Sequence, residues 1–308
     1  SALVVAGVIP IAHANDGAGS IRIPASCCGL VGLKASRGRI KDKEVPGYLP
    51  ANILHDGVVT RSVRDTWAFH SEIEQNIPAK EFPPIGSISK SFPKKLKIAV
   101  LTENCLGETS SGELIQATHD VAKLCNSIGH EVETISNPFY KKFDQDFWLL
   151  WAHFAFLIRY SVGKELNPKF DHTQLEQWPK YLISRHWKNI HKVPTAFWRL
   201  RRFVSQYEVF MQNFDILLTP TLGTTVPRLG FFGTEVSGEE HWERINNFLP
   251  FTKYQNISGA PAITLPCGTD LNGLPIGIQL ASRLGEDRLL LKLSLQLEQN
   301  SSWKSINK

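Results

Sequence analysis

The 308-residue sequence is poor in cysteine and in long apolar runs. Its five cysteines are odd in number and form no C-x-x-C pair, which argues against a zinc site or a disulfide framework and favours a cytoplasmic protein. The longest apolar run, 147–158, is interrupted by His153 and is shorter than the ~20 residues that span a bilayer. We therefore expect neither a membrane partner nor a bound metal.

A strong excess of charge of either sign is also missing. The formal net charge is +5, and we read the lysines and arginines as spread along the chain rather than gathered in one stripe. Nucleic acid is therefore not expected as a partner. Hydrophobic residues make up 42% of the chain, which is enough for a large core in one or two domains.

Strand-like and helix-like segments alternate along the sequence. A strand over 96–101, apolar residues at helical spacing over 114–128 and a strand over 130–135 form a β-α-β pattern, which predicts parallel pairing. The other expected strands are 8–14, 216–219, 262–265 and 276–280, and the other expected helices are 2–6, 21–28 and 287–298. A long aromatic helical stretch is expected over 143–210, broken by Pro168, Pro179 and Pro194. Residues 223–242 have the composition of a long surface loop. The alternation indicates the α/β class.

A glycine-rich loop separates the strand over 8–14 from the helix over 21–28. Gly17, Ala18 and Gly19 leave their backbone N–H groups uncovered, and Ser20 follows where the helix is expected to begin. Such amides bind phosphate or hold the oxyanion of an acyl intermediate. The loop lacks the G-x-x-x-x-G-K-[ST] and G-x-G-x-x-G patterns, which disfavours phosphate. The spacing alone leaves Ser20 either a helix cap or a nucleophile.

The sequence offers no evident base for a serine nucleophile. No G-x-S-x-G motif is present, and no His–Asp pair stands out as base and orienting group. His13 is near Ser20 in the sequence, but we expect it to be packed on a buried strand.

The stretch DGAGSIRIPASCCGLVGLKASRGRI, residues 16–40, resembles the pattern GTDxGGSIRxPAxxCGxxGLKPTxGR of the amidase signature family. Ala18 replaces a glycine of that pattern, and Ala35-Ser36 replaces Pro-Thr. Further segments are similar to family segments and occur in the same order: DGVVTRSVRD, FDILLTPT, FTKYQNISGAPAITLPCG, GLPIGIQL and GEDRLLL. The resemblance covers nearly the whole chain and implies a large mixed β-sheet covered by helices.

The resemblance also implies an amide hydrolase that works without a cofactor through a lysine, a serine in a cis peptide and a nucleophilic serine. Ser20 falls on the nucleophile and would form the acyl-enzyme. The residues that fall on the oxyanion-hole backbone are Gly17, Ala18, Gly19 and Ser20. Asp16 and Arg22 fall on positions that support this loop, and Lys34 is expected to be structural.

The lysine and the cis-serine of the family would lie upstream of Ser1. We therefore expect residues 1–308 to be the C-terminal part of a single amidase signature domain, incomplete at its N-terminus and inactive alone. The alternative is a non-catalytic fragment or remnant that acts as a scaffold or binding protein.

The expected partner is a small-molecule amide. The loop segment is closer to bacterial amidases of the 6-aminohexanoate cyclic dimer hydrolase type than to the tRNA-dependent amidotransferase subunit, which carries glutamine where this chain has Ile23. Aromatic side chains of one region are candidates either for an apolar substrate cleft or for a core or homodimer contact: Phe147, Trp148, Trp151, Phe154, Phe156, Trp178, Trp187 and Trp198.

Overall fold

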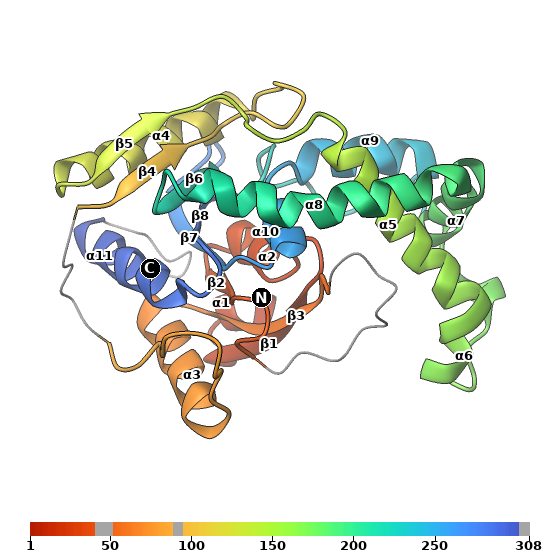
Figure 1. The fold of residues 1–308 in the computed structure, drawn as a ribbon, viewed down its shortest axis with the longest axis horizontal. Coiled ribbons are helices and arrows are strands. Elements are labelled where there is room, and N and C mark those ends of the chain that lie inside the picture. Colours follow the sequence, from red (N-terminus) through yellow and green to blue (C-terminus); the bar gives the residue numbers. More distant parts are fainter. Residues whose placement is uncertain (41–51, 89–94, 302–308) are drawn as a thin grey trace.

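The computed structural model describes residues 1–40, 52–88 and 95–301. Its centre is an eight-stranded sheet with the strand order β1-β3-β2-β7-β8-β6-β4-β5 (Figure 1). The strands are β1 (Ile11–Asp16), β2 (Val31–Lys34), β3 (His55–Thr60), β4 (Lys97–Val100), β5 (Glu131–Thr134), β6 (Ile216–Pro220), β7 (Ala262–Thr269) and β8 (Pro275–Ala281). This arrangement confirms the predicted α/β class with a large mixed sheet.

The parallel pairing that the β-α-β pattern predicted, between β4 and β5, is present, and β4 has a second parallel neighbour that was not predicted. Strand β4 pairs in parallel with β5 and with β6, whereas the remaining neighbours are antiparallel. The helix between β4 and β5 is α4 (Gly112–Ser127), close to the predicted 114–128. Apolar periodicity was thus a sound guide to this unit because its helix buries one face against the sheet.

The helices within residues 143–211 and 238–248 form a group at one side of the sheet (Figure 1). The other α-helices are α1 (Ala2–Val5), α2 (Arg22–Cys27), α3 (Val63–Asn76), α5 (Phe143–Leu157), α6 (Gly163–Leu166), α7 (Gln177–Asn189), α8 (Val193–Met211), α9 (Gly238–Phe248), α10 (Lys253–Ser258) and α11 (Asp287–Asn300). A π-helical segment η1 (Ile158–Val162) and 3-10 turns η2 (His172–Gln174) and η3 (Ile190–Lys192) join the side group. No helix of the described ranges is long and apolar enough to cross a membrane.

Strand β1 begins later than predicted and lies at an edge of the sheet. Pro10 precedes it, and proline is not suited to a strand interior. In the described part of the sheet β1 pairs with β3 alone, and exposed positions alternate with partly buried ones over residues 12–15. The expectation that His13 is packed is therefore wrong: its side chain is 74% exposed, with Nε2 at 3.1 Å from Asp56 Oδ1.

Three elements near the N-terminus were not predicted, namely β2, β3 and α3. Strand β2 has four residues and includes a glycine and a lysine, so its sequence VGLK carries little strand signal. The expected surface loop over 223–242 also ends early, because α9 begins at Gly238. The Ser237 hydroxyl accepts a hydrogen bond from Glu240 N, and this S-x-x-E capping pattern was a readable start signal.

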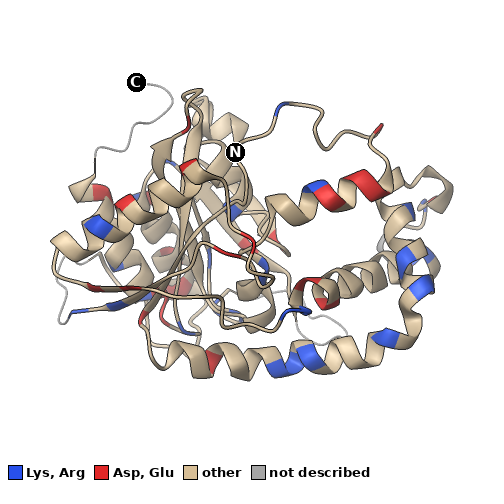
Figure 2. Cartoon of the chain, turned by 90° about the horizontal axis from the view of Figure 1, so that it is seen from above, with Lys and Arg blue, Asp and Glu red and all other residues tan. Residues whose placement is uncertain are grey.

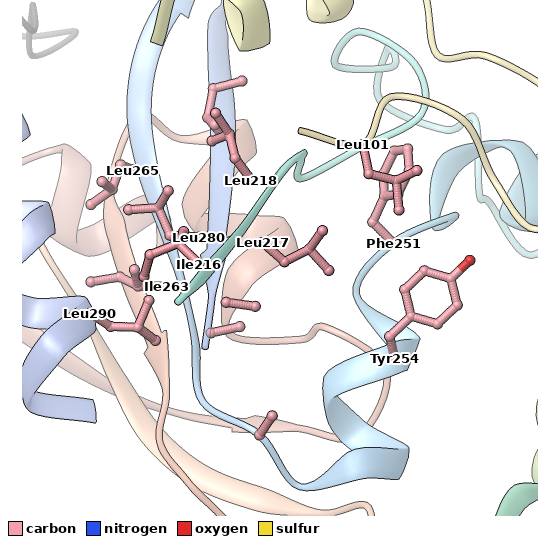
Figure 3. Close-up of a cluster of buried hydrophobic side chains, with 14 of the residues drawn as sticks. Leu101, Ile216, Leu217, Leu218, Phe251, Tyr254, Ile263, Leu265, Leu280 and Leu290 are labelled. Carbon is pink, nitrogen blue, oxygen red and sulfur yellow. The ribbon is translucent and has the colours of Figure 1, made fainter. Parts of the chain in front are cut away.

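The main core lies around β6, β7 and β8 (Figure 3). Leu217 of β6 points toward Phe251 and Tyr254, whereas Ile216 lies on the side of Ile263 and Leu290 (Figure 3). All six of these side chains are fully buried. Alternate residues of one strand thus contribute to the core on both faces of the sheet, as expected for a sheet that is covered by helices.

One lysine lies inside this sheet. Lys34 of β2 is fully buried, and its Nζ donates to the carbonyl of Ala35 at 2.9 Å. Burial, together with the nearby charge of Arg22, lowers the pKa of the Lys34 amine to about 7, although Asp16 opposes part of this effect. The fold therefore favours the neutral amine more than water does, and the structural role expected for Lys34 stays a prediction.

Replacement of Lys34 by methionine tests this burial. The unfolded amine has a pKa of about 10.4, so between pH 7 and 10 the unfolded chain binds more protons than the folded one, and wild-type stability rises with pH. Over this range the wild type should gain on the order of 4 kcal/mol relative to Lys34→Met, as measured by urea unfolding. Equal pH dependence in both proteins would contradict the buried amine.

Candidate functional site

The loop that carries Ser20 connects β1 to α2. Ser20 is exposed, and the N-cap position of α2 is Ile21, with no side-chain capping hydrogen bond. Within the described residues, no hydrogen bond is recorded for the Ser20 hydroxyl. The structure therefore gives Ser20 no capping role and leaves its hydroxyl at the surface of the loop.

A buried ion pair lies beneath this loop. Both Asp16 and Arg22 are 0% exposed. Arg22 Nε donates to Asp16 Oδ2 and Arg22 Nη2 to Asp16 Oδ1, both at 2.9 Å. The geometry is bidentate, so it fixes orientation as well as distance between the end of β1 and the start of α2.

The remaining donors of Arg22 reach two elements that are distant in sequence. Nη1 donates to Gln279 Oε1 of β8 at 2.7 Å and to Gln255 Oε1 of α10 at 3.3 Å. Nη2 also donates to Asn256 Oδ1 at 2.7 Å, and Asn256 Nδ2 donates back to Asp16 Oδ1 at 2.9 Å. Each charge of the pair therefore has additional polar partners, which a buried ion pair needs if it is to be tolerated.

The electrostatics of the pair favour the charged carboxylate. Burial alone would raise the pKa of Asp16, but the charge and hydrogen bonds of Arg22, with the hydrogen bond from Asn256, outweigh it. The pKa of Asp16 consequently lies well below its usual range, so this carboxylate stays ionised and is not a proton donor or acceptor at neutral pH.

The backbone amides of the loop fall into two groups. Gly19 N donates to Asp16 Oδ1 at 2.7 Å, and Ile21 N donates to Asp16 Oδ2 at 3.3 Å. Because Gly19 N already donates to this carboxylate, we do not count it among the candidate oxyanion donors, and the oxyanion-hole assignment itself stays a prediction. In the described part of the chain, no hydrogen bond is recorded from the amides of Gly17, Ala18 and Ser20.

Close packing explains both glycines of the loop. Gly19 has φ +122°, and an added Cβ would lie 2.6 Å from Ile23 Cδ1 and 2.7 Å from Thr252 Oγ1. Thr252 Oγ1 also donates to the carbonyl of Ala18 at 2.5 Å, which anchors the loop from outside. At Gly17 an added Cβ would lie 3.0 Å from a side-chain atom of Trp151.

The structure brings only part of the aromatic set to this loop. Trp151 lies against Gly17, while Phe147 and Trp148 are buried in the core. Trp187 and Trp198 are more than half exposed on α7 and α8. The set is therefore divided among the loop, the core and the outer surface rather than lining one cleft.

Residues from the C-terminal third complete the site and were not assigned roles from the sequence. They are Thr252, Gln255, Asn256 and Gln279, and all four are fully buried. In the sequence, such a residue can be recognised as a polar residue within an otherwise apolar segment, as Gln279 is in PIGIQLA. A buried amide requires partners, but the sequence alone does not say that the partner is Arg22.

The described residues hold no group of three or more His, Cys, Asp or Glu side chains arranged for a metal ion. The arrangement offers an exposed hydroxyl beside three backbone amides that have no hydrogen-bond partner within residues 1–40, 52–88 and 95–301. A buried ion pair holds the loop that carries them. These are the parts that nucleophilic attack on a carbonyl requires, apart from a base.

Comparison with known proteins places this geometry in a family. The Amidase family profile matches residues 1–291. The chain is 39% identical over 307 residues to the protein named "Putative amidase AmiC" of Mycobacterium tuberculosis. The aligned region covers 99% of this chain and 64% of that protein. It is 31% identical over 332 residues to 6-aminohexanoate-cyclic-dimer hydrolase of Pseudomonas sp. strain NK87, covering 98% and 65%. The chain thus spans less than two thirds of these relatives.

Solved structures agree with the sequence relatives. A 6-aminohexanoate cyclic dimer hydrolase complexed with substrate superposes with a TM-score of 0.79 at 28% identity, covering 98% of this chain and 67% of that one. A bacterial aryl acylamidase of the amidase signature family has a TM-score of 0.80 at 24% identity, over 98% and 64%, and shows the shared fold. The profile match, the relatives and the fold lead to one conclusion: this chain belongs to the amidase signature family.

Proposed function

We propose that this chain carries the nucleophile and the oxyanion hole of an enzyme that hydrolyses carboxylic amides. The observation that carries the proposal is the exposed hydroxyl of Ser20 beside the amides of Gly17, Ala18 and Ser20, which have no recorded partners among the described residues. Asp16 and Arg22 do not take part in the chemistry. They hold the loop in place through the buried pair and its partners on α10 and β8.

The proposed reaction proceeds through a covalent intermediate. Ser20 Oγ attacks the carbonyl carbon of the amide as its proton leaves to a base, and the carbonyl oxygen becomes an oxyanion. The free loop amides hold this charge, which is worth about 3–4 kcal/mol per donor in comparable sites. The C–N bond then breaks, the leaving amine takes a proton, and water hydrolyses the acyl-enzyme to release the acid and Ser20.

The base is the part of the mechanism that residues 1–308 do not provide in this proposal. No described side chain is recorded in a hydrogen bond with Ser20, and Lys34 bonds to the carbonyl of Ala35 instead. The family resemblance implies a lysine that acts through a cis-serine, and neither corresponds to a residue of this sequence. We therefore expect the 308-residue chain alone to show no turnover.

The proposed substrate is a small amide with an apolar acyl or aryl part. Trp151 and Leu54 support this choice because both approach the position of a Cβ on Gly17 to 3.0 Å. They form an apolar surface next to the loop. The relatives named as a cyclic dimer hydrolase and an aryl acylamidase are similar proteins whose names agree with such a substrate.

Replacing Ser20 with alanine tests the nucleophile. In the active protein that contains these residues, Ser20→Ala should lower kcat for a small aryl amide by on the order of 10⁴-fold or more, because the covalent step is lost. Ser127→Ala, an exposed hydroxyl on α4, is the matched control and should leave kcat unchanged. A fluorophosphonate followed by peptide mapping should label Ser20 in the wild type only.

Two results would decide against this role. Full activity of Ser20→Ala would remove Ser20 from the mechanism. A folded protein that contains the whole family pattern but is never acylated would favour the alternative, a non-catalytic scaffold or binding protein.

Replacing Asp16 with asparagine tests the support of the loop. At pH 7 this change should destabilise the protein by about 3–5 kcal/mol, because Arg22 stays buried without its counter-charge. Since the pKa of Asp16 is lower in the folded state, its contribution is complete above about pH 4 and is lost as the pH falls further. Urea unfolding should therefore show a difference between wild type and Asp16→Asn that shrinks from pH 5 to pH 2.

Asp120→Asn is the control for this experiment. Asp120 is exposed on α4, where it pairs with Lys123 in solvent, so its replacement should change stability by less than about 0.5 kcal/mol. If Asp16→Asn behaves like Asp120→Asn, then the buried pair does not hold the loop.

A further inference from the structure

The helices of the side group carry more positive charge than the chain as a whole. From Gln177 at the start of α7 to Met211 at the end of α8, seven lysines and arginines face one acidic residue, Glu208. The segment has a net charge of +7 − 1 = +6, whereas the whole chain has +5. Blue ribbon accordingly predominates over red along the long helix α8 (Figure 2). The expectation of evenly spread basic residues does not hold in this region.

Part of this charge surrounds a cavity between α5, α7, η3 and α8, with Trp242 of α9 at its wall. We call it the basic cavity. Its volume is about 320 Å³, and its lining includes Lys142, Arg185, Lys192 and Arg199. A volume of this size lies in the range of small-ligand sites. The cavity shares no lining residue with the Ser20 loop.

The single acidic side chain of the basic cavity is already neutralised. Asp146 is buried, and Arg199 Nε and Nη2 donate to its two oxygens at 2.5 and 2.6 Å. Lys142, Arg185 and Lys192 have no acidic partner among the described residues. Four cations and one carboxylate thus leave a net charge of +3 around a space that is not filled by protein.

Two of the unpaired cations are held in position. The Arg185 guanidinium lies 4.0 Å from the centre of the Trp242 ring, and Nη1 donates to the hydroxyl of Tyr181 at 3.3 Å. Lys192 Nζ donates to Asn189 Oδ1 at 2.9 Å. Both side chains therefore lose less conformational freedom when they bind a ligand than free surface side chains would.

We propose that the basic cavity binds a small oxyanion, namely the phosphate or carboxylate group of a small molecule. A planar guanidinium and nearby ammonium groups match the charge and the geometry of such groups. The Trp148 and Trp242 rings at the wall provide an apolar surface for the body that carries the anion. This site is independent of the hydrolysis proposed at Ser20.

Calorimetric titration of the 308-residue chain tests the proposal. The probes are sodium phosphate and sodium succinate, each compared with sodium chloride at equal ionic strength. At least one of the two oxyanions should bind in the titration, whereas chloride should not. In a separate thermal unfolding experiment the same oxyanion should raise the melting temperature, because binding to the folded state stabilises it by mass action. Binding of phosphate alone assigns a phosphate group to the ligand, and binding of succinate alone assigns a carboxylate.

Lys192→Gln should raise the dissociation constant of the oxyanion that binds at least tenfold, and Arg185→Gln should do the same. Lys188→Gln removes the same charge from an exposed position on α7 outside the cavity lining and should change it less than twofold. Because Lys192 is exposed, its variant should fold even if the loss of the Arg185 stack destabilises the other one. The proposal fails if neither oxyanion binds, if chloride stabilises the chain equally, or if Lys188→Gln weakens binding as much as Lys192→Gln.

Discussion

The buried pair of Asp16 and Arg22 joins segments of the chain that are far apart in the sequence. The carboxylate ends β1, the guanidinium begins α2, and the amides of α10 and β8 complete their coordination. Removing two charges from water costs several kcal/mol per ion unless each finds good partners. The polar residues around the pair offset that cost, and in doing so they fix the loop between the two charges. The exposed hydroxyl of Ser20 thus depends on contacts that lie below the surface.

The Asp16 carboxylate accepts hydrogen bonds from some backbone amides of the loop and not from others. Asp16 accepts the hydrogen bonds from Gly19 and Ile21, so these two amides serve to hold the backbone. Within the described ranges, the amides of Gly17, Ala18 and Ser20 have no hydrogen-bond partner, and they are the donors of the oxyanion hole that we propose. Helix α5 contributes to two different regions in a comparable way, since Trp151 lies against Gly17 while Lys142 and Asp146 border the basic cavity.

The sequence predicted the parts of this structure that follow local rules. The β4-α4-β5 unit follows from apolar spacing, and the glycine loop is recognisable because it resembles a long and specific family pattern. Strand β2 and the exposure of His13 did not follow, because both depend on which strand lies next to which in the sheet. The same limit applies to Gln279, whose partner is 257 residues away. Spacing shows that such a residue is buried, but only the fold shows what it contacts.

The long separation between Arg22 and its amide partners has a consequence for the order of events during synthesis. Arg22 leaves the ribosome more than 230 residues ahead of Gln255, Asn256 and Gln279. Until α10 and β8 have emerged, the guanidinium has no complete set of acceptors and cannot be enclosed without a large desolvation cost. The glycine loop is therefore made well before α10 and β8, but it takes its final shape only after both have emerged. A nascent or proteolysed chain that ends before α10 keeps the serine but not the means to present it.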